Sequence, residues 1–134
     1  MSLKGSQTEQ NLKDLSLQAL GDVKDSTLAT LLRKQKHLLN CDLSESENVG
    51  EQTFVALQAC TALESLNVSY SYKIPAQAIR DLLSKTKNLR YLFLKDLVLT
   101  PTTFQTSVAE HLVQLDIGAC RGLNPKSLLD IVYR

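Results

Sequence analysis

An internal repeat of about 25 residues constrains the fold of this chain more than any other feature. The spacing Leu-x-x-Leu-x-Leu occurs at Leu89, Leu92 and Leu94, and apolar residues or a cysteine take the same places in four other copies. The first leucines of the copies lie 26, 25, 26 and 23 residues apart, and they are Leu12, Leu38, Leu63, Leu89 and Leu112. A period of this length indicates a solenoid, in which each unit buries its apolar side chains against the neighbouring units.

Each copy has the pattern of a short strand, a turn and a helix. The leucine spacing alternates as in a strand, and further along each copy apolar residues recur every three or four positions, as on one face of a helix. These later residues are Leu28, Leu31 or Leu32, Phe54, Leu57, Ile79, Leu82 or Leu83, Phe104, Val108, Leu128, and Ile131 or Val132. Five such units predict an α/β solenoid with a parallel sheet on the concave side and helices on the convex side.

The helix starts are marked by proline and by residues that cap helices. Pro75, Pro101 and Pro125 lie 12 or 13 residues after their first leucines, and proline suits the first helical turn because its missing N–H is not needed there. The predicted N-caps are Asp25 and Ser26 for the first helix, Asn48 for the second, Thr100 for the fourth and Asn124 for the fifth.

Composition is that of an ordinary globular domain, with 43% hydrophobic and 22% charged residues. The net charge of +1 offers no large field of one sign, so we expect neither a nucleic acid nor a membrane as partner. The start of the chain has no apolar core and does not resemble a signal peptide. Three cysteines at irregular spacing indicate free thiols, hence a reducing cytoplasmic or nuclear compartment. We expect residues 1–11 to form a flexible leader and residues 12–134 to form the repeat domain.

The repeat resembles the leucine-rich repeat family over residues 12–134. The last copy, "LVQLDIGACRGL" from Leu112 to Leu123, is similar to the cysteine-containing subclass, L-x-x-L-x-L-x-x-C-x-x-L. In that subclass the cysteine, here Cys120, is buried and helps to hold the loop after the strand. The other copies have Leu20, Ser46, Ser71 and Leu97 at this position. The resemblance implies a binding module. The subclass is common in substrate-recognising subunits of ubiquitin ligases, where an F-box precedes the repeats, and none is visible here.

The residues between the leucines are expected to point outward, onto the concave surface, in three columns. The columns are Asp14, Asn40, Ser65, Tyr91 and Gln114; Ser16, Asp42, Asn67, Phe93 and Asp116; and Gln18, Ser44, Ser69, Lys95 and Gly118. Nearly all are polar, and the adjacent Tyr91 and Phe93 are the exceptions. The predicted partner-binding residues are Tyr91, Phe93, Lys95, Asn67, Ser69, Tyr70, Gln114 and Asp116.

Two interpretations of the aromatic pair stay open. Aromatic side chains surrounded by polar groups are typical of binding hot spots. Alternatively, a segment such as the leader covers the rings, or two exposed apolar residues have no significance. The carboxylates of Asp14, Asp42 and Asp116 favour either a basic partner or a solvated polar face.

No motif in the sequence predicts catalysis, a metal or a cofactor. His37 and His111 are three repeats apart, about 14 Å at one strand spacing per repeat, so they cannot share one zinc ion. We therefore predict a non-catalytic protein-interaction module. Its alternatives are the substrate-recognition part of a ubiquitin ligase and a targeting or regulatory region of a larger enzyme or effector. The apolar residues of the last helix predict either a longer repeat protein or end-to-end self-association of the C-terminal repeat.

Overall fold

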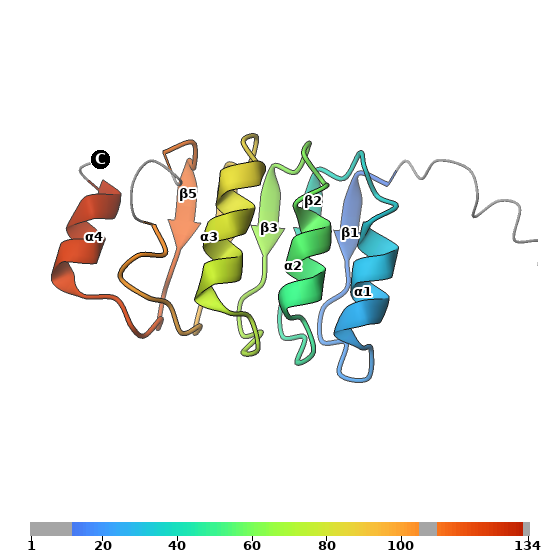
Figure 1. Ribbon diagram of the computed structural model, residues 1–134, viewed down its shortest axis with the longest axis horizontal. Coiled ribbons are helices and arrows are strands. Elements are labelled where there is room, and N and C mark those ends of the chain that lie inside the picture. The colour runs from blue at the N-terminus through green and yellow to red at the C-terminus, as the bar shows by residue number, and fades with distance from the viewer. Residues whose placement is uncertain (1–11, 105–109, 133–134) are drawn as a thin grey trace, which may run out of the picture.

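The strands and helices form two layers, with one parallel sheet behind a row of helices (Figure 1). The computed structural model describes residues 12–104 and 110–132. The strands are β1 (Asp14–Ser16), β2 (Asn40–Asp42), β3 (Ser65–Asn67), β4 (Tyr91–Phe93) and β5 (Gln114–Asp116). The helices are α1 (Asp25–Leu32), α2 (Glu51–Leu57), α3 (Ala76–Lys85) and α4 (Pro125–Val132). None of these helices is long and apolar enough to cross a membrane.

The strands lie in sequence order and in one register, which confirms the predicted α/β repeat solenoid. The central column faces the helices and is made of Leu15, Cys41, Leu66, Leu92 and Leu115. In the fourth unit, residues 101–104 form turns. The remainder of the helix predicted there, including Val108, falls in residues 105–109, outside the described residues.

The same backbone hydrogen bonds recur at all four strand junctions, with N···O distances of 2.7–3.0 Å. The carbonyl before each strand accepts two N–H groups from the next unit, as Lys13 does from Leu39 and Asn40. The N–H group of the residue after each strand donates to the backbone carbonyl of the last strand residue in the next unit, as Leu17 does to Asp42. Two residues further along each unit, a second N–H group donates to a backbone carbonyl of the next unit. These donors belong to Ala19, Glu45, Tyr70 and Asp96. These residues and Ala119 are left-handed, with φ of 58–61°, so each chain turns away from the sheet in the same way.

The cysteine position of the repeat is a hydrogen-bond donor position. Cys120 Sγ donates to the carbonyl of Leu94 in the preceding unit at 2.8 Å. Ser71 Oγ donates to Leu43 and Ser46 Oγ to Leu17, each at 3.1 Å and each to the equivalent carbonyl. Serine in these copies therefore makes the bond that cysteine makes in the last copy.

One helix cap crosses from one unit to the next. Asp25 was predicted to cap α1, but the N-cap there is Lys24 and makes no side-chain hydrogen bond, so the prediction was wrong. The Asp25 carboxylate instead accepts from the N–H groups of Gly50, Gln52 and Thr53 at the start of α2, at 2.9–3.0 Å, and from Thr53 Oγ1 at 2.5 Å. A Cβ on Gly50 would lie 3.0 Å from Asp25 Oδ2, so glycine leaves room for this carboxylate.

The other predicted caps had mixed outcomes. Asn124 Oδ1 accepts from the N–H of Ser127 at 2.8 Å, which confirms it as the cap of α4. Asn48 does not cap α2, because its amide donates to the carbonyl of Gly21. Ser26 lies inside α1 and does not cap it. Thr100 precedes a turn, where its N–H donates to Thr103 Oγ1.

We predict that Asp25→Ala lowers the free energy of unfolding by about 1–2 kcal/mol, because it removes a charged cap and leaves N–H groups of α2 without a partner. Ser26→Ala is the matched control and should change it by less than about 0.5 kcal/mol. Urea denaturation measures both. Equal effects of the two variants would contradict the cross-unit cap.

The same cap predicts a pH dependence. Burial alone would raise the pKa of Asp25, but the hydrogen bonds from Thr53, Gly50 and Gln52 outweigh it and lower the pKa below 3.8. The folded-state pKa is therefore below the unfolded one, so the stabilisation is complete well above pH 3.8 and disappears as the pH falls through the folded value. The difference in stability between the native chain and Asp25→Ala should shrink over that range.

We predict that Ser71→Ala costs about 1–3 kcal/mol of stability, because it leaves the buried carbonyl of Leu43 without its donor. Ser71→Cys places at this position the residue that Cys120 provides in the last copy. It should lose less stability than Ser71→Ala, because the thiol can still donate to the carbonyl of Leu43. Thermal and urea unfolding of the two variants give the comparison. If cysteine proved no better than alanine, the interpretation of this position as a donor position would fail.

Candidate functional site

The helix-free face of the sheet, called the sheet face here, presents the first two predicted columns side by side. Tyr91 and Phe93 lie on β4, where Tyr91 is 38% exposed and Phe93 is half-buried. Gln114 and Asp116 lie beside them on β5, and Asn67 lies beside Phe93 on β3. The register of the strands thus brings these five predicted residues into one area.

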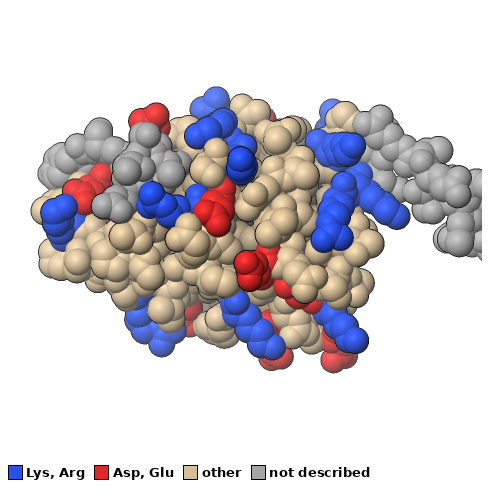
Figure 2. Space-filling view, in the orientation of Figure 1, with Lys and Arg blue, Asp and Glu red and all other residues tan. Residues whose placement is uncertain are grey.

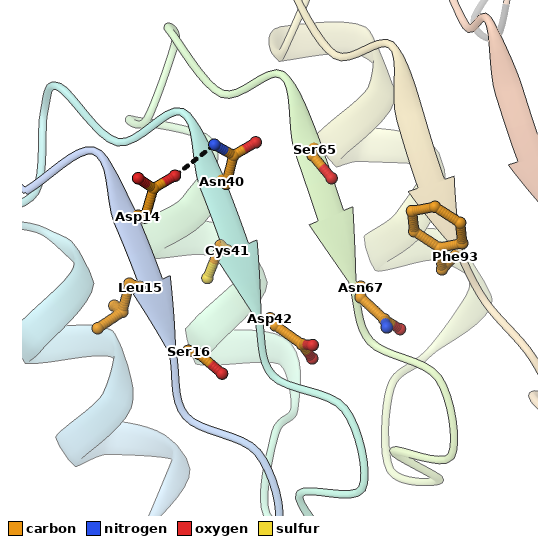
Figure 3. Close-up of a pocket in the computed structure, with 9 residues that line it drawn as sticks. All are labelled: Asp14, Leu15, Ser16, Asn40, Cys41, Asp42, Ser65, Asn67 and Phe93. Carbon is orange, nitrogen blue, oxygen red and sulfur yellow. Dashed lines mark hydrogen bonds between the residues drawn. The ribbon is translucent and has the colours of Figure 1, made fainter.

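Two shallow grooves run along the sheet face. The first, of about 410 Å³, extends over β1 to β4, with the ring of Phe93 at one end and the Asp14–Asn40 hydrogen bond at the other (Figure 3). The second, of about 340 Å³, is lined by Tyr70, Phe93, Lys95, Asn67, Ser69, Asp116, Gln18, Asp42, Ser44 and Glu45. Phe93 is shared by both grooves.

The first groove adds residues that were not among the predicted binding residues. Asp14, Asn40 and Asp42 were placed in the outward columns, but the binding site was predicted only around the aromatic pair. The signal that points to them is their position in the same columns as Tyr91 and Phe93. Tyr72 lies outside both grooves. It is 61% exposed, and its hydroxyl donates to Asp96 Oδ2 at 3.1 Å, at the edge where the strands end.

Carboxylates set the charge of the grooves. The second groove is lined by Asp42, Glu45 and Asp116 together with one ammonium group, that of Lys95. Lys95 Nζ lies 3.5 Å from Asp116 Oδ2, and both side chains are partly exposed, so this ion pair contributes less than about 1 kcal/mol. The other hydrogen bonds to Asp42 and Asp116 come from neutral donors, so their negative charge remains available to a ligand.

Two residues of the third predicted column do not face the solvent as expected, whereas Gln18, Lys95 and Gly118 are exposed. Ser44 and Ser69 are 8% and 3% exposed. The chain bends inward after the strand because Asp42 and Asn67 accept hydrogen bonds from the N–H groups of Ser44 and Ser69, two residues further on, at 2.9 and 3.0 Å. These serines support the sheet face from below.

Phe93 replaces the acceptor of this bend in the fourth unit, and Ser69 compensates for it. A phenylalanine cannot accept the N–H of Lys95, so Ser69 Oγ of the neighbouring unit accepts it at 2.9 Å. Tyr70 follows Ser69 in the left-handed conformation, with φ of 61°. Ser69 therefore holds the backbone of both units in place around the aromatic residues.

The three cysteine thiols all have raised pKa values. Burial raises the pKa of Cys41 to about 12 and that of Cys60 to about 11, so both thiols are protonated at neutral pH. Burial also raises the pKa of Cys120. Among the described residues, no three or more His, Cys, Asp or Glu side chains gather as a metal site would require.

Several basic residues lie along the edge of the solenoid that holds the helix-to-strand connections. These connections lie at the upper edge in Figure 1, and Figure 2 shows Lys and Arg side chains there as well as along the lower edge. The basic residues at or beside these connections are Lys13, Arg33, Lys34, Lys36, Lys85, Lys87 and Arg90. The carboxyl ends of the helices favour cations. Burial and the charges of Lys87 and Arg90 lower the pKa of His111, which lies near them.

Comparisons with known proteins show the fold. No protein-family model matches the sequence, and a search of curated proteins finds no match. The tropomodulin C-terminal domain of Caenorhabditis elegans is similar with a TM-score of 0.72 and 14% identity over 92% of this chain and 81% of that domain. A chain of the yeast Rad7–Elc1 complex is similar with a TM-score of 0.71 and 16% identity, over 92% of this chain and 33% of that one. This chain thus spans about a third of that neighbour, and both likenesses are to folds of leucine-rich-repeat type.

We predict an energetic coupling between Ser69 and Phe93. Ser69→Ala should cost about 1–2 kcal/mol in the native chain, because Lys95 loses its acceptor. In a Phe93→Asn background the loss should be smaller by about 1 kcal/mol, because the asparagine can accept that N–H itself, as Asn67 does in the previous unit. A double-mutant cycle in urea measures the coupling. Additive effects would show that the two positions are independent.

Proposed function

We propose that this chain is a non-catalytic protein-interaction module that binds a protein partner on its sheet face. The contact residues would be Tyr91, Phe93, Lys95, Tyr70, Asn67, Gln114 and Asp116, with Ser69 as their support. The observation that carries the proposal is the group of three partly exposed aromatic side chains, Tyr70, Tyr91 and Phe93, on a face that is otherwise polar.

The geometry of this group suits protein recognition. Phe93 lies where the two grooves meet, so an apolar side chain of a partner could pack against its ring while the partner continues over polar residues on both sides. Interfaces concentrate their affinity in such aromatic centres with a polar rim. Asp42 and Asp116, which line the second groove with the ring, and Asp14 at the far end of the first groove favour a partner segment with basic side chains.

The partner proposal is tested with the chain as bait in affinity capture followed by quantitative mass spectrometry. We predict that Tyr91→Ala with Phe93→Ala lowers the recovery of specifically captured proteins at least about tenfold. Tyr72→Ala is the matched control, because it removes an exposed tyrosine outside the grooves and should leave recovery unchanged. Circular dichroism and thermal unfolding show whether each variant is folded. A folded double variant that captures the same proteins as the native chain would contradict the proposal.

A second candidate is the substrate-recognition part of a ubiquitin ligase. The similarity of the last copy to the cysteine-containing subclass supports it, and Cys120 donates a hydrogen bond at the position that defines this subclass. Likeness to a chain of the Rad7–Elc1 complex supports a role within a larger assembly. The full reading frame tests this candidate, because it requires an F-box or an equivalent adaptor-binding segment beyond these residues.

A further inference from the structure

The two ends of the solenoid expose side chains that belong to buried layers. Leu128 is 45% exposed, whereas the equivalent residues Leu28, Phe54 and Ile79 are 2%, 0% and 0% exposed. Leu12 is 43% exposed at the other end, although Leu38, Leu63 and Leu89 at the equivalent position are fully buried. The half-buried apolar residues of the two ends are Leu15, Leu17, Leu20 and Val23, and Leu112, Leu115, Ile117, Cys120, Leu123 and Ile131.

The backbone groups at the two ends are complementary. Within the described part of the chain no strand lies beyond β5, so the carbonyl of Val113 and the N–H groups of Ile117 and Ala119 face outward. At β1, the N–H groups of Lys13 and Asp14 and the carbonyls of Ser16 and Gln18 face outward. Groups at the same repeat positions pair at all four internal junctions.

We propose that the chain associates head to tail with a second copy of itself, with β5 of one copy pairing with β1 of the next in the internal register. Gln114 would lie beside Asp14, Leu115 beside Leu15 and Asp116 beside Ser16, so no like charges meet on the sheet face. Leu128 and Leu12 would enter apolar layers that their equivalents already fill inside the solenoid.

A second copy fits these ends better than an unrelated surface does, because it supplies a strand and a helix in the spacing of the repeat itself. At the internal junctions the carbonyl equivalent to that of Val113 accepts two successive N–H groups, and the N–H groups of Lys13 and Asp14 at β1 have this spacing. The contact joins two different surfaces, so it does not close as a symmetric pair and each added copy leaves both ends available. The mean mass should therefore rise steadily with concentration.

Sedimentation velocity and light scattering of the full chain over a concentration series test the proposal. We expect the weight-average mass to increase with concentration for the native chain. Leu128→Glu should block the β5 end and Leu12→Glu the β1 end, and each variant alone should stay monomeric, with association weakened at least about tenfold, because a carboxylate would be buried in an apolar layer. Both positions are exposed, so both variants should fold, which circular dichroism checks.

Two further measurements are specific to the head-to-tail arrangement. Val55→Glu is the matched control, because Val55 is 53% exposed on α2 in the middle of the solenoid and lies at neither end, so assembly should be retained. An equimolar mixture of Leu12→Glu and Leu128→Glu should form a dimer, since each variant keeps the end that the other lacks. A monomeric native chain at every concentration, or a mixture that stays monomeric, would overturn the proposal. Tyr91→Ala with Phe93→Ala should still assemble, which separates this proposal from the function of the sheet face.

Discussion

Backbone hydrogen bonding between successive units at one register is the interaction on which the rest of the structure depends. Each strand has only three residues, so no strand is stable alone, and each unit provides donors and acceptors that fit the next. Because the register never slips, residues at the same repeat position lie side by side. The apolar columns then build one continuous core, and the polar columns build one continuous face.

Polar side chains that reach into a neighbouring unit strengthen this arrangement. Asp25 caps the helix of the next unit, Ser71 and Cys120 donate to a carbonyl of the preceding one, and Ser69 accepts an N–H from the following one. All of these bonds cross a junction between units. Stability is therefore shared between neighbours, which is the physical reason why solenoids behave as stacks of interdependent units.

The position of Phe93 shows how an aromatic side chain can enter the polar face of such a stack. An aromatic ring replaces the acceptor that bends the chain in the neighbouring units, and the fold tolerates it because Ser69 takes over the hydrogen bond. The ring is then available at the junction of two grooves on a rigid sheet. The sheet keeps the surrounding carboxylates and Lys95 at fixed positions, so the proposed partner would meet a preorganised surface.

The period of the leucines was enough to predict the solenoid, the parallel sheet and the residues of each column, because translation by one unit places equivalent residues side by side. Residues such as Asp25, Asn48 and Ser69 could not be placed in this way. A local pattern predicts that a capping residue serves its own helix and that a serine beside a strand faces the solvent. Their actual partners lie about 25 residues away in sequence and become neighbours only when the units stack. The repeat pattern in the sequence sets which side chains share a column, whereas the stacking of the units sets which of them reach across a junction, because that depends on distances between units that no single repeat contains.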